Sequence, residues 1–374
     1  MISSHAGFCH VLAYLHIPFC HRVCPYCSFY KHTPGGTSIS AFIDALLLEA
    51  RQRITSLEEK PRTLFLGGGT PSMLSPTHLE KLMQGLQEVM DFSALEEISL
   101  EANPATFDLA KARLFRDLGI TRVSLGIQSF SAHVLETLGR EHNPEQAMRS
   151  VEILHEAGLP SVNIDLMFSI PGQSLGDWQK SVQQAISLHP HHISAYNLTY
   201  EEDTAFFQSL LAGDMQADEA RDGDHFELAH DLLTSAGFEH YETSNYSQPG
   251  HRSIHNSGYW RGEPYLGLGP SAVSTVDAVR SKNIADTARY IDMMENIGHA
   301  LAESESLSVE DLRLERIALG LRTSEGISRQ LLDQAGKKRA GDLEELGLLR
   351  LEGETIMLTR RGSALVDAIA GEIA

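Results

Sequence analysis

Cysteine is scarce in this sequence. There are four among 374 residues, and three of them, Cys20, Cys24 and Cys27, lie within eight residues of one another. A disulfide framework in a small secreted domain needs more cysteines, spread along the chain, so that class is excluded. A tight group in a long chain indicates instead a metal site in a reducing compartment. The fourth, Cys9, lies eleven residues before the group and is interpreted as a spare thiol.

Basic side chains and long apolar runs are also scarce. Thirty Lys and Arg residues stand against fifty Asp and Glu residues, which gives a formal net charge of -20 at pH 7. So acidic a chain repels the phosphates of nucleic acids and anionic membrane surfaces, and we expect no nucleic-acid partner. No stretch approaches the roughly 20 apolar residues that span a bilayer, and the first 20 residues lack the early Lys or Arg of a signal peptide. The sequence therefore predicts a cytoplasmic protein without a membrane span.

The first 240 residues alternate short apolar runs with amphipathic stretches. Strands are predicted at residues 11–17, 63–66, 97–101, 122–127, 162–168 and 192–198. Helices are predicted at residues 39–54, 76–90, 108–118, 144–157 and 175–188. Repeated strand–helix units of this spacing build a parallel sheet, and six are too few for the closed eightfold barrel. We therefore predict an α/β fold, with a partial (β/α)6 barrel over residues 1–240.

The rest of the chain has a different character. Residues 241–300 contain many Gly, Pro, Ser and aromatic residues and are expected to form an irregular connecting region. From about residue 286 the chain is expected to be mostly helical, with a short hairpin over residues 348–358 and a last helix after it. This order predicts a mostly helical, winged-helix-like appendage over residues 301–374. Because its acidic residues offset its basic ones, covering a pocket or docking a protein partner is favoured over DNA binding.

The cysteine group has the spacing C-x3-C-x2-C over residues 20–27. Thiolates are soft ligands that favour zinc, copper(I) or iron–sulfur clusters. Three of them on one loop can hold three corners of a [4Fe–4S] cluster and leave the fourth iron open, whereas a cluster bound only by protein takes four. The alternative is a structural zinc site, with a fourth ligand from Cys9, His16, His21 or His32. The loop follows the first predicted strand at the mouth where barrel enzymes keep their chemistry, which favours the cluster.

Polar groups follow several of the other predicted strands. The second strand runs into a Gly-rich segment with Thr70, the third ends at Glu101, and the fourth ends at Gln128, twelve residues before Arg140. The fifth contains Asp165, and a carboxylate in so apolar a run is costly to bury unless it is paired. Each residue singly has a structural explanation. Together they place polar groups at the same end of successive strands, which predicts one pocket there.

The segments Tyr14-x-His16-Ile17-Pro18-Phe19-Cys20 and Cys24-Pro25-Tyr26-Cys27-Ser28-Phe29 resemble the radical-SAM superfamily. Within it, the chain is similar to the HemN-like group from about residue 11 to its end. The resemblance implies a [4Fe–4S] cluster on the three cysteines and S-adenosylmethionine (SAM) on the open iron. It also implies one-electron cleavage of SAM to methionine and a 5'-deoxyadenosyl radical. The cofactor-binding residues implied in this part of the chain are Tyr14, Tyr26, Gly68, Gly69, Thr70, Glu101, Gln128, Arg140 and Asp165.

The HemN-like group contains oxygen-independent coproporphyrinogen III dehydrogenases and haem chaperones. The dehydrogenases carry a further cysteine where this sequence has Phe29, and they have a longer segment before the cluster than the 19 residues here. His255, Tyr259 and Trp260 fit the H-N-x-x-Y-W pattern of the chaperones. A histidine can bind haem iron, and the two aromatic rings can pack on the macrocycle.

The local residues alone favour a structural loop with a buried aromatic anchor, in which His255 bonds to backbone. The resemblance favours a haem carrier that hands haem to apo-haemoproteins such as respiratory enzymes. The alternative is oxidative decarboxylation of coproporphyrinogen III to protoporphyrinogen IX.

Two smaller features complete the expectations. His189, His191 and His192 flank Pro190 and are interpreted as a solvated turn at the end of the barrel away from the chemistry. Tyr196 and Asn197 end the sixth predicted strand at the opposite end and are expected to line the pocket.

Overall fold

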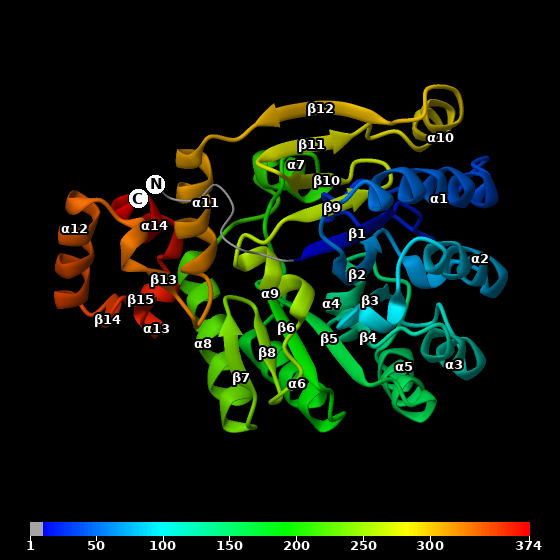
Figure 1. The fold of residues 1–374 in the computed structure, drawn as a ribbon. Coiled ribbons are helices and arrows are strands. Elements are labelled where there is room, and N and C mark those ends of the chain that lie inside the picture. The colour runs from blue at the N-terminus through cyan, green and yellow to red at the C-terminus, as the bar shows by residue number, and fades with distance from the viewer. Residues whose placement is uncertain (1–9) are drawn as a thin grey trace.

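The computed structural model describes residues 10–374, and Cys9 lies outside the described residues. Six parallel strands form the centre of the larger sheet, in the order of the sequence. They are β1 (Val11–Ile17), β2 (Pro61–Gly68), β3 (Glu97–Ala102), β4 (Arg122–Gln128), β5 (Ser161–Phe168) and β6 (His192–Asn197). The helices between them are α1 (Ile39–Thr55), α2 (Pro76–Gln87), α3 (Leu109–Asp117), α4 (Ala132–Thr137), α5 (Pro144–Ala157) and α6 (Leu175–Ser187). Helices α1, α2, α3, α5 and α6 cover one side of the curved sheet (Figure 1), so the predicted α/β partial barrel is confirmed.

Further strands extend the sheet at both of its ends. On the β6 side are β7 (Glu239–Glu242) and β8 (Asn245–Ser247), after the helices α7 (Ala205–Ala212) and α8 (Glu219–Ser235). On the β1 side are β9 (Tyr265–Leu268), β10 (Val273–Val276), β11 (Val279–Asn283) and β12 (Leu301–Ser306). Strand β9 pairs with β1 in parallel, and the strands beyond it are antiparallel. The larger sheet therefore has twelve strands in the part of the chain that is described.

One expectation for this region was wrong. Residues 241–300 are not irregular, because they contain β8 to β11 and the helices α9 (Ile254–Trp260) and α10 (Thr287–Asn296). Their Gly and Pro residues mark turns between strands of three to five residues, too short to give an apolar pattern. The stretch after residue 286 also includes a strand, β12, whose six residues are all exposed at the sheet edge. An edge strand without a buried face leaves no alternation in its sequence.

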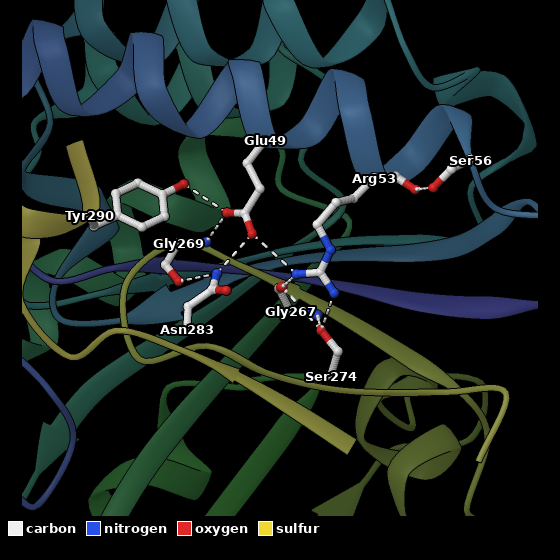
Figure 2. Close-up of polar contacts among 8 residues, drawn as sticks. All are labelled: Glu49, Arg53, Ser56, Gly267, Gly269, Ser274, Asn283 and Tyr290. Atoms are coloured by element: carbon white, nitrogen blue, oxygen red, sulfur yellow. Dashed lines mark hydrogen bonds and ion pairs between the residues drawn. The ribbon is translucent and has the colours of Figure 1, made fainter. Parts of the chain in front are cut away.

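A buried carboxylate joins the added strands to the barrel (Figure 2). Glu49 of α1 is 2% exposed and accepts hydrogen bonds from the Gly269 backbone N–H at 2.8 Å, Asn283 Nδ2 at 2.8 Å and the Tyr290 hydroxyl at 2.7 Å. Arg53, one turn further along α1, donates to Glu49 at 3.1 Å and also to the backbone of β9 and a serine of β10. Because this carboxylate has donors from four residues, its burial is compensated and it fixes β9 to β11 against α1.

Helix α9 packs against the inner side of the curved sheet. Glu97, the first residue of β3, accepts from the backbone N–H groups of Ile254 at 2.8 Å and His255 at 3.2 Å, and from the Ser253 hydroxyl at 3.2 Å. A carboxylate is favoured there because the first N–H groups of a helix have no partner within it. Figure 1 shows α9 between the two halves of the sheet. The helix is therefore fixed at the amino ends of the strands, opposite the cysteine loop.

The last part of the chain has a hydrophobic core of its own, which includes Ile317, Leu343, Ile356 and Ile369. It contains α11 (Val309–Gly320), β13 (Ile327–Ser328), α12 (Gln334–Glu345), β14 (Leu349–Glu352), β15 (Thr355–Leu358), α13 (Arg360–Ser363) and α14 (Val366–Ile373). The predicted hairpin is confirmed as β14 and β15, and β13 adds a third antiparallel strand. We call residues 309–374 the C-terminal unit.

Backbone hydrogen bonds connect the C-terminal unit to the barrel. Ser324 N–H donates to Tyr241 O, and Thr243 N–H donates to Arg322 O, both at 2.9 Å. Arg360 also forms ion pairs with Glu227 and Asp231 of α8. Helix α11 in addition contacts α9. In the described part of the chain, no helix combines the length and apolar character that crossing a bilayer requires.

Candidate functional site

The cysteine loop follows β1 directly. The Cys20 N–H donates to His32 O at 3.0 Å, and the Thr70 N–H donates to Phe19 O at 2.7 Å, so the loop is tied to the segments after it and after β2. All three cysteines are half-buried free thiols. Burial raises the pKa of Cys20 and of Cys27, so nearby donors are needed to favour the thiolate form.

Two side chains supply such donors to the sulfur atoms. The Thr70 hydroxyl donates to Cys20 Sγ at 3.4 Å, and Arg140 Nη1 donates to Cys24 Sγ at 3.7 Å. Donors and a positive charge beside thiolates fit a cluster whose sulfur ligands carry negative charge. Among the residues described, no three His, Cys, Asp or Glu side chains converge on one metal ion. In a [4Fe–4S] cluster each of the three thiolates binds a different iron atom, so the three sulfur atoms need not converge on one point.

The alternative zinc site fits less well. His16 Nδ1 accepts from the Tyr14 hydroxyl at 3.0 Å, and its Nε2 donates to Tyr30 O at 2.7 Å. His32 likewise uses both ring nitrogens, with Thr33 O and the Thr287 hydroxyl as partners, each at 2.7 Å. Neither histidine is therefore free to complete a zinc site. His21 is exposed, and Cys9 lies outside the described residues.

The cysteines open into a cavity of about 800 Å³, which we call the cluster-side cavity. The structure brings to its wall every residue that the resemblance assigned to the SAM pocket. These are Tyr14, Tyr26, Gly68, Gly69, Thr70, Glu101, Gln128, Arg140 and Asp165. Tyr196, Asn197 and Phe29 also lie on this wall, and Phe29 is 63% exposed. Strand ends in one sheet thus meet at one cavity, as the sequence predicts.

Two carboxyl groups face this cavity from β3 and β5. Glu101 accepts from the Gly68 backbone N–H at 2.9 Å, and desolvation, helped by the nearby charge of Asp165, raises its pKa to about 7. Asp165 accepts from the Ser124 hydroxyl at 3.0 Å and from Asn163 Nδ2 at 2.7 Å. Burial raises the pKa of Asp165 as well. Asp165 therefore meets neutral donors instead of the charged partner that its burial suggested.

Arg140 and Gln128 carry buried polar atoms without partners in the described structure. Arg140 Nη2 donates to Asn103 Oδ1 and Gly126 O, both at 2.6 Å, whereas its Nε has no acceptor. Gln128 Oε1 has no donor, and the backbone of Gln128 has a φ of 70°, which non-glycine residues rarely adopt. An unsatisfied donor and an unsatisfied acceptor on one wall fit a polar ligand such as SAM.

Sequence reasoning missed several polar residues of the same cavity. Asn103, Ser124, Asn163 and Ser194 line it and take part in its hydrogen bonds. The signal was period-two alternation: Asn163 shares a face of β5 with Asp165, and Ser124 shares one of β4 with Gly126. Attention to the strand ends alone left these inner positions unassigned.

His255 of the H-N-x-x-Y-W segment is 1% exposed on α9. Its Nδ1 forms a 2.7 Å hydrogen bond with the Thr63 hydroxyl, and its ring stacks on Phe65 with centroids 4.9 Å apart. Its Nε2 has no partner among the described residues, and burial lowers its pKa to about 3. The ring is therefore a neutral imidazole, held by a side-chain hydroxyl and not by backbone.

The three residues expected to hold one haem do not face one cavity. His255 lines the cluster-side cavity, and Trp260 lines a second cavity of about 710 Å³, which we call the α9–α11 cavity. Tyr259 borders both. The motif therefore lies on the wall between two neighbouring spaces.

The expectation of a solvated turn at His189–His192 was wrong for His192. This residue is 1% exposed, its Nδ1 donates to Asn163 Oδ1 at 2.6 Å, and its Nε2 accepts from the Tyr241 hydroxyl at 2.8 Å. As the first residue of β6 its side chain points to the inner face of the sheet, where it connects β5 to β7. His191 is half-buried against His251, with ring centroids 4.4 Å apart.

Known proteins are similar to this chain in sequence and in fold. Residues 14–185 match the family model described as the Radical SAM superfamily. Heme chaperone HemW from Bacillus subtilis (strain 168) is 31% identical over 370 residues, which cover 96% of this chain and 98% of that protein. Heme chaperone HemW from Lactococcus lactis is 36% identical over 84% of this chain and 82% of the relative. The protein of that name from Escherichia coli (strain K12) is 39% identical over 69% and 68%.

A solved structure has the same fold over nearly the full length. Coproporphyrinogen III oxidase (HemN) from Escherichia coli, a radical SAM enzyme, superposes with a TM-score of 0.83 at 22% identity. The match covers 99% of this chain and 92% of the HemN chain. At that identity the likeness shows the fold alone. The superfamily match implies a [4Fe–4S] cluster and SAM. The extent and identity of the sequence matches show that the chain belongs to the HemW family of radical-SAM proteins.

Proposed function

We propose that this protein is a haem chaperone, which binds haem and transfers it to apo-haemoproteins, respiratory enzymes among them. The observation that carries the proposal is the match over 370 residues to a relative named Heme chaperone HemW. Phe29, in place of the further cysteine, supports a carrier over a decarboxylase. The aromatic pair Tyr259 and Trp260 beside an apolar cavity supports haem binding.

The proposed role of the cluster-side cavity is to hold SAM beside the cysteine loop. When bound and reduced, the cluster supplies one electron to the sulfonium of SAM. Cys20, Cys24 and Cys27 would be its ligands, with Arg140 and Thr70 as donors to the sulfur atoms. Glu101 and Gln128 offer acceptor oxygens to polar groups of SAM, and Gly69 lets the backbone after β2 pack closely against the segment after β1.

Haem could be bound in either of the two cavities. An axial bond to His255 would place haem in the cluster-side cavity, whereas stacking on Trp260 would place it in the α9–α11 cavity. The axial role of His255 stays a prediction. It is tested by titrating haem into His255→Ala and, as a control, into His133→Ala, whose ring is exposed on α4. An unchanged Soret band and haem affinity in His255→Ala would remove that role.

The main experiment is an anaerobic haem titration of the cluster-loaded protein, with coproporphyrinogen III offered in a parallel tube. We expect stoichiometric haem binding, transfer of haem to an added apo-haemoprotein, and no protoporphyrinogen. Turnover of coproporphyrinogen III together with weak haem binding would contradict the proposal. The protein would then be a porphyrinogen decarboxylase despite Phe29.

A further inference from the structure

The α9–α11 cavity lies between the barrel and the C-terminal unit. On one side it is bounded by Tyr259 and Trp260 of α9 and by Tyr265 of β9, and on the other by Leu312 and Leu319 of α11. Its volume of about 710 Å³ is in the range of sites that bury a ligand of drug size or larger. The walls named here offer aromatic and aliphatic side chains, which suit a flat and largely apolar molecule.

The floor of this cavity carries two buried oxygen atoms that lack hydrogen-bond donors in the described structure. Glu242 is 2% exposed and its Oε1 is unpartnered, and Asn245 is 4% exposed with an unpartnered Oδ1. Both residues line the cavity, at the turn between β7 and β8. Burial raises the pKa of the Glu242 carboxyl to about 7, although the side chains of Asn245 and Trp260 interact with it. A ligand that donates a hydrogen bond to Glu242 Oε1 or Asn245 Oδ1 would satisfy an acceptor atom that has no donor in the described structure. A water molecule held by haem iron is a donor of this kind.

The wall formed by β11 and α11 carries three arginines together with Glu315. Arg280, Arg313 and Arg316 line it, and Arg280 and Arg313 are oriented by Glu315 and Glu310 respectively. Burial lowers the pKa of Arg316, so an anionic group beside it would be favoured. The propionates of haem are acceptors and suit this wall, not the floor with Glu242. The polar groups of the cavity therefore favour one orientation of the macrocycle, with its propionates towards the arginines.

We propose that the α9–α11 cavity holds the haem macrocycle, with Trp260 against the ring, Glu242 and Asn245 at its centre and the arginines at its propionates. This rests on the proposed haem-binding function and adds the place of binding. The cluster-side cavity, whose walls carry Glu101, Arg122 and Asp165, suits the polar SAM. Haem and SAM then occupy separate spaces that share the Tyr259 wall, and both can be bound at once.

The first test needs no variant. SAM binding to cluster-loaded protein is measured anaerobically by equilibrium dialysis, without haem and with haem at saturation. Separate sites leave the dissociation constant of SAM within about twofold. A dissociation constant that rises in proportion to haem concentration would mean that haem fills the cluster-side cavity, and it would overturn the proposal. Wild-type protein that binds no haem at all would instead overturn the proposed function, and this inference with it.

Two matched variants each reduce the volume of one cavity by adding a large side chain to its wall. Ala318→Trp places a large side chain in the α9–α11 cavity from α11, and Asn197→Trp does the same at the cluster-side cavity. We expect Ala318→Trp to weaken haem binding at least about tenfold with SAM binding retained, and Asn197→Trp to weaken SAM binding with haem binding retained. The reverse pattern, or haem binding unchanged in an Ala318→Trp protein that still binds SAM, contradicts the proposal.

Glu242 supplies a third test that changes little volume. Glu242→Leu removes the acceptor oxygens at the floor, whereas Glu242→Gln keeps one. We expect the first to weaken haem binding about tenfold and the second to restore most of it, with a shifted Soret band in the leucine variant. SAM binding and the melting temperature report whether each variant is folded. Wild-type haem affinity and a wild-type spectrum in both variants would exclude contact between haem and Glu242.

Discussion

At the scale of single residues, the cysteine loop gives the most direct prediction. Cys24→Ser is expected to abolish the iron–sulfur absorption of the reconstituted protein and, with it, tight SAM binding, because a neutral hydroxyl does not replace a thiolate ligand. Cys9→Ser is the matched control, and as a spare thiol it is expected to leave both unchanged. Iron and sulfide analysis together with the visible spectrum measures the outcome. Full cluster loading in Cys24→Ser would exclude this residue as a ligand.

The buried imidazole of His255 predicts a dependence of stability on acid. Burial lowers its pKa to about 3, against about 6.5 in an unfolded chain, and the neighbouring Thr63, Phe65 and Tyr259 are uncharged. The stability that follows from this shift is present above pH 6.5 and is lost as the pH falls towards 3, because the unfolded chain then binds the proton.

His255→Asn removes this proton uptake. Between pH 7.5 and 5.5 the wild-type protein is expected to lose about 1 kcal/mol more unfolding free energy than the variant does. Denaturant unfolding at the two pH values measures the difference, and the exposed His133→Ala variant should behave like the wild type. Parallel losses in wild type and His255→Asn would show that the folded protein also protonates this ring.

At the scale of elements, Glu97 fixes the helix that carries the aromatic motif. Glu97→Ala leaves two N–H groups of α9 and the Ser253 hydroxyl without their acceptor, which is expected to cost about 3 kcal/mol of unfolding free energy. Glu96→Ala, one residue earlier, removes only a partly exposed ion pair with Arg62 and should cost less than about 1 kcal/mol. Chemical denaturation compares the two variants. Equal costs would mean that Glu97 does not anchor α9.

The elements also show what sequence could and could not predict. The six barrel strands and their helices were predictable because each buried strand is followed by an amphipathic helix with its own caps, as at Asn143 and Ser174. Strand β12 has no buried residue, so no pattern marked it. Cavity-lining residues at strand ends, such as Glu101 and Gln128, follow from the topology of a parallel sheet. The separation of His255 from Trp260 depends on how α9 docks, which local patterns do not encode.

At the scale of the whole molecule, the C-terminal unit has a core separate from that of the barrel. The polar contacts between the two include two backbone hydrogen bonds near Tyr241 and Thr243, the bidentate ion pair of Arg280 with Glu315, and the exposed ion pairs of Arg252 and Arg360. Helix α11 also packs on α9. Regions with their own core and a small interface open at lower free energy than the global transition.

Amide hydrogen exchange tests this difference. Amides of β14, β15 and α12 are expected to exchange at least about tenfold faster than those of β2 to β5. Saturation with haem should slow exchange in the C-terminal unit more than in the barrel, since a ligand stabilises the state to which it binds. Uniform protection along the described chain would show instead that barrel and C-terminal unit unfold together.

Strand β3 has one further consequence. Glu97 at its first residue holds α9, and Glu101, four residues later on the same face, borders the cluster-side cavity. Four residues of extended chain span about 13 Å, a length that is set by covalent geometry and that thermal motion hardly alters. The strand thus fixes the distance between the aromatic motif and the proposed SAM site. We therefore expect any opening that lets a large flat molecule enter or leave the α9–α11 cavity to involve a shift of α11 and not of α9.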